Sequence, residues 1–254
     1  PVGFMDELRD PERQVACWPP TIVQDFLFPN EFKYRIEKFK EKALGPVLLH
    51  PARQLRCEGH GTVAAREEVE AFLAKGDAPV CFCWGAIAIA SVKRLFEACI
   101  GALRLGGRRG VILSRYTKMH PGVVQQLSPV DKTYFQENVI FQRAVPHGWL
   151  FPQCCLVVNH GGRGTFYEAL RAGIPMLLVA EKDEGMKASF LRALRTHASV
   201  HPHKQQLERL TAELLSKGIG EVLSKDRFKE AAAELREAYH KWPGEEGLNR
   251  AVRT

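Results

Sequence analysis

The stretch that most constrains the fold is residues 156–175, where an apolar run, a glycine-rich turn and an amphipathic helix follow one another. Leu156 to Val158 is typical of a buried strand, and the turn after it opens a helix at about Arg163. Backbone N–H groups in such a turn, together with the positive end of the helix dipole, favour an anion above the loop. The order strand, glycine turn, helix therefore predicts a phosphate-binding site.

The same turn carries side chains that suit a phosphorylated ligand. His160 and Thr165 can donate hydrogen bonds, and Glu168, one helical turn later, can accept them from ribose hydroxyls. The glycines that let a ligand approach the backbone are Gly161, Gly162 and Gly164. A diphosphate with a ribose beside it is the head of a nucleotide sugar, so we expect such a ligand. The alternative is a glycine turn that only joins a strand to a helix.

Strands and helices alternate regularly from residue 78 onward. Apolar runs predict strands over 78–84, 110–114, 138–141, 156–158 and 176–179. Helices are expected between them, at about 185–195 and, to close the chain, near 204–217, 220–239 and 244–252. Repeated units of this length imply an α/β fold, a Rossmann-like doubly wound parallel sheet with helices on both faces. Ligands of such sheets bind beyond the carboxyl ends of the strands, where the glycine turn falls.

Charge and composition narrow the classes of partner. The chain has 254 residues, a hydrophobic fraction of 45% and a formal net charge of +7, which favours anionic partners such as phosphorylated ligands or an anionic membrane surface. Much of the positive charge is scattered, for example on a predicted solvated helix near residues 30–43 where it is interleaved with Glu, and aromatic stacking platforms are not evident. We therefore expect no nucleic-acid partner.

Cysteine and histidine usage predicts neither disulfides nor a metal. The chain has seven cysteines, an odd number, and no Cys-x-x-Cys pair. We therefore expect the protein in a reducing compartment, the cytosol. Most of the cysteines lie in apolar segments, where a thiol behaves as a small hydrophobe. His197, His201 and His203 are expected in a polar loop without a nearby acid cluster. We therefore predict no metal site.

A family resemblance rests on the glycine turn and two neighbouring blocks. The run His-Gly-Gly-x-Gly-Thr-x-x-Glu from His160 to Glu168, followed by Gly-x-Pro, resembles the donor-site signature of GT-B glycosyltransferases. Residues 145–152 and 170–173 are similar to the sterol 3β-glucosyltransferase branch. The resemblance implies the C-terminal half of a GT-B enzyme. It implies no cofactor, a UDP-sugar as co-substrate, and transfer of a hexose to a lipid-like acceptor such as a sterol.

The resemblance also implies further donor contacts. Gly85 follows the first strand, where small residues of the family approach the donor phosphates. Val145 and His147 stand where the family receives the uracil base, although His147 would equally suit a helix start without a ligand. Asp183 and Glu184 stand where an Asp-Gln pair holds hydroxyls of the transferred sugar. Two acids favoured by a helix dipole are the alternative for that pair.

Three positions depart from the family pattern. Ala86 replaces a hydroxyl residue, Asn159 replaces the first His of a His-His pair, and Glu184 replaces Gln. These departures leave a second class of function open, a degenerate UDP-sugar-binding module without turnover. A third alternative is a subunit that needs a separate acceptor-binding partner chain.

No catalytic base is identified, since in the sterol branch it belongs to the N-terminal, acceptor-binding half. Residues 1–76 are too few for that half and are expected to be an N-terminal extension and interdomain linker. Residues 77–254 are expected to form the nucleotide-sugar-binding domain with its C-terminal helices. Because the chain begins at Pro1 rather than Met, we expect upstream residues in the native protein. A cytoplasmic location, peripheral to a membrane at most, completes the prediction.

Overall fold

The computed structural model describes residues 48–85, 91–114, 119–179 and 210–240, together with the backbone of three short strands. Two of these strands, β1 (Val15–Ala16) and β2 (Lys42–Ala43), pair in parallel with each other. The third is the last strand of the main sheet. Predicted helices at 185–195 and 244–252 lie outside the described residues.

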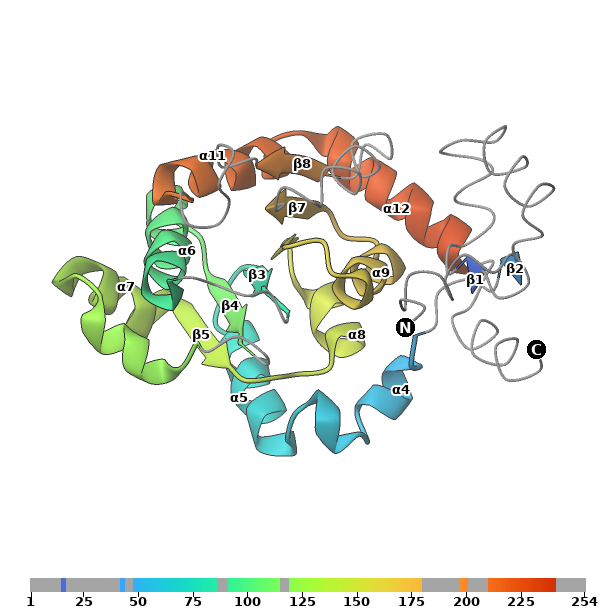
Figure 1. The fold of residues 1–254 in the computed structure, drawn as a ribbon, viewed down its shortest axis with the longest axis horizontal. Coiled ribbons are helices and arrows are strands. Elements are labelled where there is room, and N and C mark those ends of the chain that lie inside the picture. Colours follow the sequence, from blue (N-terminus) through green and yellow to red (C-terminus); the bar gives the residue numbers. More distant parts are fainter. Residues whose placement is uncertain are drawn as a thin grey trace, which may run out of the picture.

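The main sheet has six strands in the order β5-β4-β3-β6-β7-β8 (Figure 1). Their bounds are β3 Val80–Cys83, β4 Gly110–Leu113, β5 Val139–Gln142, β6 Leu156–Asn159, β7 Met176–Val179 and β8 His197–Val200. All neighbouring strands are parallel. Counted from β3, this is the order 3-2-1-4-5-6 of a doubly wound sheet, which places its ligand crevice between β3 and β6. The predicted fold class is confirmed.

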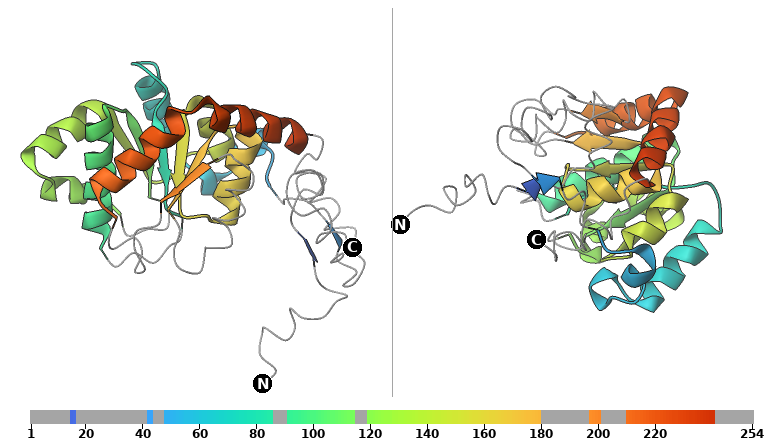
Figure 2. Two further views of the ribbon diagram at one scale, coloured as in Figure 1. Left: turned by 90° about the horizontal axis from the view of Figure 1, so that it is seen from above. Right: turned by 90° about the vertical axis from the view of Figure 1, so that its right-hand side faces the viewer.

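Helices cover both faces of this sheet (Figure 2). One face packs against α6 (Val92–Gly106), η2 (Pro121–Gln126), α7 (Pro129–Asn138) and α11 (Ala212–Leu223). The other packs against α5 (Val63–Leu73), α8 (His147–Leu150), η3 (Phe151–Gln153), α9 (Arg163–Ala172) and α12 (Asp226–His240). Two short helical turns, α4 (Pro51–Gln54) and η1 (Glu58–His60), precede α5.

Strand β3 shows why the central strands have continuous apolar runs. Its side chains alternate between the two faces, with Val80 and Phe82 in the apolar cluster beside α6 and Cys81 and Cys83 in the cluster beside α9. All four are buried, because helices lie on both sides of a parallel sheet. Burial of these cysteines agrees with the prediction that they pack as small hydrophobes.

Local signals fix the ends of the two helices that follow the central strands. Helix α6 starts after Ser91, whose side chain accepts from the Arg94 N–H at 3.4 Å, and ends at Gly107 in the left-handed region with φ +59°. Helix α9 starts after Gly162 and ends at Gly173, with φ +71°. The predicted start of α9 at Arg163 is confirmed, and a glycine ends each of the two helices.

The C-terminal helices differ from their predicted bounds. A break was expected near Gly218, but α11 continues through it to Leu223, because Leu215, Ile219 and Val222 keep helical spacing and are buried. Helix α11 also packs closely against α6, where a Cβ on Gly101 of α6 would lie 2.7 Å from the Cβ of Ala212 at the start of α11. Tertiary packing has outweighed the low helix propensity of glycine here.

Two further elements correct the sequence-based expectations. His197, expected in a polar loop, is the first residue of β8, which pairs with Met176 of β7. Helix α7 was not predicted, although Ser128 caps it by accepting from the Asp131 N–H at 3.2 Å and Pro129 occupies its first position.

The segment before β3 contributes to the same core. Leu48 and Val69 are buried in the apolar cluster that includes α9 and α12. The proposed boundary at residues 76 and 77 stays a prediction. Within the described parts of the chain, no helix combines the length and apolar character needed to cross a membrane.

Candidate functional site

The carboxyl ends of the two central strands meet at Gly85 and His160. Gly85 follows β3 with φ +56°, and a Cβ built on it would lie 2.4 Å from Cε1 of His160. A Cβ on Gly162 would lie 2.7 Å from the same imidazole. The His160 ring is therefore packed between two glycines, and neither position has room for a side chain. The structure brings these three predicted residues together at the switch point of the sheet.

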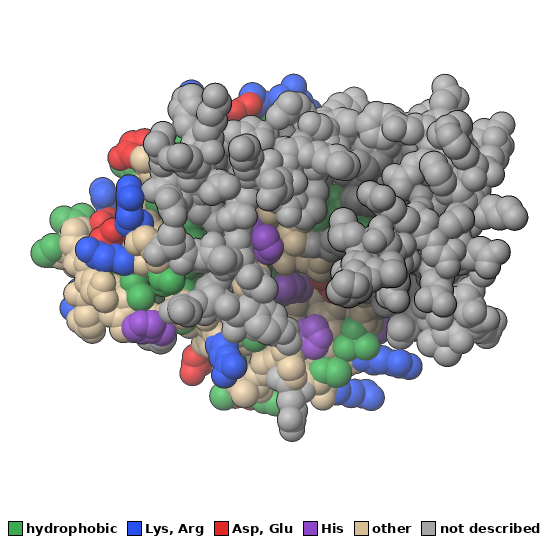
Figure 3. Space-filling view, in the orientation of Figure 1, with side chains coloured by type: hydrophobic (Ala, Val, Ile, Leu, Met, Phe, Trp, Pro, Cys, Tyr) green, Lys and Arg blue, Asp and Glu red, His purple; other side chains and the backbone are tan. Residues whose placement is uncertain are grey.

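Several histidine side chains are exposed near the middle of the face shown in Figure 3. Of the histidines, His147 and His160 follow the carboxyl ends of β5 and β6, where an imidazole can donate a hydrogen bond to an anion. The arrangement of this edge therefore agrees with the anionic ligand expected from the glycine turn.

Asn159 has a structural role in the glycine turn. This last residue of β6 is fully buried, and its Oδ1 accepts a hydrogen bond of 2.8 Å from the N–H of Gly161, which has φ +88°. Its Nδ2 is buried without a partner among the described residues. Buried amide donors ordinarily find an acceptor, so this group is available to one at the turn. The Asn159 side chain thus holds the glycine turn in place.

The N-terminus of α9 is open on the side of the turn. Five other described helices begin with a side chain that accepts from their first turn: His50, Thr62, Ser91, Ser128 and Thr211. Helix α9 begins after Gly162, which has no side chain to do so. Its first N–H groups and the positive end of its dipole are therefore left for a ligand. Thr165 is buried in this first turn, and no described atom lies within 4 Å of a Cβ on Gly164.

Glu168, predicted to accept from ribose hydroxyls, is held from two sides. Its Oε1 accepts a hydrogen bond of 2.6 Å from Gln54 Nε2, and its Oε2 forms an ion pair with Arg171. Burial raises the pKa of the Glu168 carboxyl, while the charge of Arg171, the Gln54 amide and nearby His147 act in the opposite direction. The carboxylate is thus oriented before any ligand binds.

His147 and Val145 occupy the loop and helix start that follow β5. The His147 ring stacks on Phe151 with ring centres 4.7 Å apart, and its Nε2 lies 3.9 Å from Cys83 Sγ. Val145 is buried. Burial raises the pKa of the Cys83 thiol, but the Cys81 thiol, 3.7 Å away, and His147 lower it overall to about 6.

Sequence reasoning missed three residues of this region. Cys83 carries an imidazole contact beyond its packing role, and its position at the carboxyl end of β3 was the available signal. Arg171 lies three positions after Glu168, a spacing at which helical side chains pair. Gln54 comes from the segment before the sheet, and no local pattern distinguishes it.

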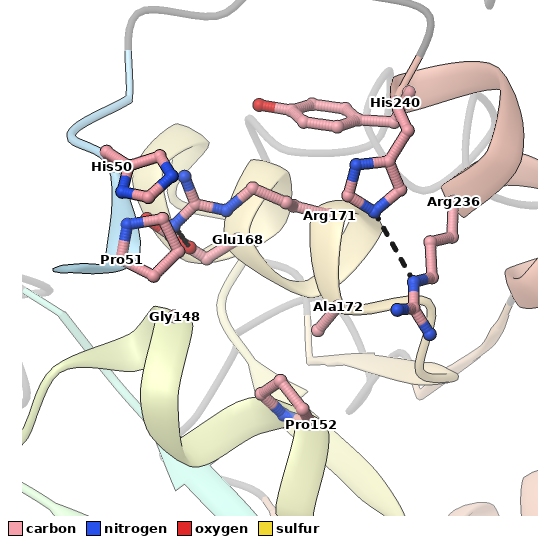
Figure 4. A pocket seen from close by; sticks show the side chains of 10 residues that line it. His50, Pro51, Gly148, Pro152, Glu168, Arg171, Ala172, Arg236 and His240 are labelled. Atoms are coloured by element: carbon pink, nitrogen blue, oxygen red, sulfur yellow. Dashed lines mark hydrogen bonds and ion pairs between the residues drawn. The ribbon is translucent and has the colours of Figure 1, made fainter. Parts of the chain in front are cut away.

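A cavity of about 410 Å³ adjoins Glu168 (Figure 4). It lies between α8, α9, α12 and the residues just before α4, and it is lined by His50, Pro51, Gly148, Pro152, Glu168, Arg171, Ala172, Arg236, Tyr239 and His240. The basic side chains outnumber Glu168, so the cavity favours an anionic or hydroxyl-bearing group.

The remaining predicted positions are not placed by the structure. Asp183 and Glu184, expected to hold the transferred sugar, lie outside the described residues, as does Ala86. Over the described ranges, no group of three or more His, Cys, Asp or Glu side chains is arranged to hold a metal ion.

Comparison with known families gives a match over the C-terminal half of the chain. Residues 123–247 match the family described as erythromycin biosynthesis protein CIII-like, C-terminal domain. A sterol 3-beta-glucosyltransferase of Arabidopsis thaliana is 33% identical over 112 residues, which are 44% of this chain and 16% of that protein.

Solved structures share the fold. Os79 of O. sativa, in complex with UDP and deoxynivalenol-3-glucoside, has a TM-score of 0.64 at 18% identity and covers 82% of this chain and 47% of its own. The glycosyltransferase VinC, in complex with DTDP, has a TM-score of 0.54 at 23% identity and covers 72% of this chain and 43% of its own. The chain thus spans under a fifth of the plant relative and under half of each of these structures.

Proposed function

Because residues 123–247 form an EryCIII-like C-terminal domain within the fold of the C-terminal half of GT-B glycosyltransferases, we propose that this chain binds a UDP-sugar as a donor domain. The observation that carries the proposal is the packing of His160 between Gly85 and Gly162, where β3 and β6 end. The open N-terminus of α9 begins at the same point. Together they support an anion site for the diphosphate of the donor.

The nucleoside would lie along α9, away from this anion site. We assign the uracil base to the backbone of Val145 and to His147, and the ribose hydroxyls to Glu168. His147 lies close enough to Glu168 to influence its carboxyl electrostatically, so both can face one nucleoside. Asp183 and Glu184 are proposed to hold the hydroxyls of the transferred sugar.

Transfer would be a displacement at the anomeric carbon. The bond from that carbon to the diphosphate oxygen breaks, the acceptor hydroxyl oxygen forms the new bond, and its proton passes to a base. The N–H groups of α9 and His160 would stabilise the negative charge that develops on the leaving diphosphate. We propose that the base and the acceptor site lie outside the described domain, on an acceptor-binding half or a partner chain.

The acceptor is proposed to be a sterol or another lipid-like alcohol, on the strength of the plant relative. The net charge of +7 supports contact with an anionic membrane surface while such an acceptor is reached. A cytoplasmic location is part of the same proposal.

A UDP-sugar-binding module without turnover is the second candidate. Asn159 favours it, since it stands where the family has the first histidine of a His-His pair and its side chain accepts from the Gly161 N–H of the turn instead. The two candidate functions, a transferase donor domain and a module without turnover, can be separated by measuring the release of UDP from UDP-glucose in the presence of an acceptor-binding partner. Sustained release supports the enzyme, and binding without release supports the module.

Gly85→Ala tests the anion site. UDP should raise the Tm of the wild-type chain. When the UDP concentration is a hundred times Kd, the folded state is stabilised by about 2.7 kcal/mol. The alanine Cβ would displace the His160 ring, so the variant should lose most of this shift. Gly107→Ala is the matched control, because Gly107 has a similar φ of +59° and no described atom within 4 Å of its Cβ. Equal UDP shifts in the two variants would contradict the assignment.

A further inference from the structure

The segment that precedes the sheet reaches into the nucleoside region through Gln54. This last residue of α4 is only 1% exposed. Its Nε2 donates to the Leu49 carbonyl at 2.9 Å and to Glu168 Oε1 at 2.6 Å, and its Oε1 accepts from the Gly148 N–H at 3.1 Å. All of these bonds are buried or partly buried, so the amide has a single orientation.

Gln54 links the two elements that flank the proposed nucleoside. Gly148 belongs to α8, which follows the residues assigned to uracil, and Glu168 belongs to α9. The missing side chain of Gly148 makes this link possible, since a Cβ there would lie 2.7 Å from Arg171 Nη2 and 3.1 Å from Pro51 Cγ. Figure 4 shows Pro51, Glu168 and Arg171 close together beside Gly148.

Arg171 completes the hold on Glu168. It pairs with Oε2, and its Nη1 donates to the Leu49 carbonyl at 3.1 Å. One donor therefore occupies each oxygen of the carboxylate. A carboxylate has about four acceptor positions, so about two remain, the number that a ribose 2′,3′-diol requires.

We propose that Gln54 is a positioning residue that fixes Glu168 for a ribose diol and so makes the site prefer UDP to 2′-deoxy-UDP. This inference rests on the proposed function. Its physical basis is that a site built to bond a hydroxyl discriminates strongly against an analogue that lacks it, provided that the acceptor cannot turn away. Without Gln54, the Glu168 side chain could rotate and the discrimination would fall.

Gln54→Met is the test, because methionine is also long and unbranched but makes none of the three hydrogen bonds. Calorimetric titration would give Kd for UDP and for 2′-deoxy-UDP. We expect the wild-type chain to prefer UDP about tenfold, as the loss of one bond to a charged group implies. The variant should lose most of this preference, through weaker binding of UDP.

Gln153→Met is the matched control, since that amide is exposed and donates only to the Trp149 carbonyl at 2.9 Å. It should leave both Kd values unchanged. Gln54→Glu serves as a second variant, because its side chain can donate to Glu168 only when protonated. At neutral pH this variant should lose the preference for UDP, as Gln54→Met does.

Three outcomes would overturn the inference. They are an unchanged preference in Gln54→Met, tighter binding of UDP by that variant, and an equal loss of affinity for both nucleotides. Tighter binding would mean that Gln54 competes with the ligand, and an equal loss would mean general structural damage. If the wild-type chain binds no UDP at all, the proposed function fails. If it binds UDP but Gln54 has no effect on the preference, this inference alone fails.

Discussion

Gly61→Ala is expected to lower the stability of the protein by about 3 kcal/mol, a drop in Tm of roughly 6–12 °C. Gly61 has φ +109°, which costs about 1–3 kcal/mol for a residue with a side chain. Its Cβ would also lie 2.2 Å from the carbonyl oxygen of Ala144, a backbone atom that cannot rotate away. The substitution should therefore separate the segment before α5 from the loop that carries Val145. Thermal unfolding followed by circular dichroism measures the effect.

Two glycines serve as controls for this experiment. Gly107→Ala also places a side chain at a positive φ, but its Cβ meets no described atom within 4 Å. This variant should therefore lose only about 1 kcal/mol of stability. Gly220→Ala, within α11 and with open space around its Cβ, should stabilise by about 0.5–1 kcal/mol. A Gly61→Ala variant no less stable than Gly107→Ala would show that the close approach to Ala144 is unimportant.

His160→Ala is expected to weaken UDP binding by about 1–3 kcal/mol, which is roughly a fivefold to hundredfold rise in Kd. The imidazole is fixed between Gly85 and Gly162, at the edge where the open N-terminus of α9 begins. Its loss would remove the hydrogen bond that we propose it donates to a charged phosphate group. Calorimetric titration with UDP gives the change in Kd.

His120→Ala is the control for this substitution. His120 is exposed before η2, and its side chain does not cap that helical turn. UDP affinity should be unchanged in this variant. If His160→Ala lowered the Tm but left UDP affinity intact, His160 would be a packing residue of the turn and not a ligand contact.

Much of the fold was predictable because its signals are local. The fully apolar run around Phe82 indicates a strand buried on both faces, and Gly107 and Gly173 mark helix ends. Because strands and helices alternate, the strands are expected to form a parallel sheet, and the carboxyl ends of parallel strands lie at one edge. Gly85 and His160 each follow a central strand, so both could be placed at this edge before their contact was seen. The position of the candidate site at the carboxyl edge of the sheet therefore follows from the topology.

The parts that sequence reasoning missed depend on contacts between distant residues. Gln54 meets Glu168 across more than a hundred residues, and nothing near Gln54 marks it as buried. His197 joins β8 because β7 offers it an edge, although the residues around it are polar. Helix α11 passes through Gly218 because α6 supplies the packing that the glycine itself does not. In each case tertiary structure outweighs local preference.

The central claim is that the junction of β3, β6 and α9 holds the diphosphate of a UDP-sugar. Calorimetric titration of the wild-type chain with UDP and, separately, with UMP tests it most directly. The account predicts one UDP site per chain with a Kd below millimolar, and binding of UMP weaker by about tenfold, because UMP lacks the second phosphate that His160 and α9 would bind. An absence of binding heat at millimolar UDP, or equal affinities for UDP and UMP, would contradict the account.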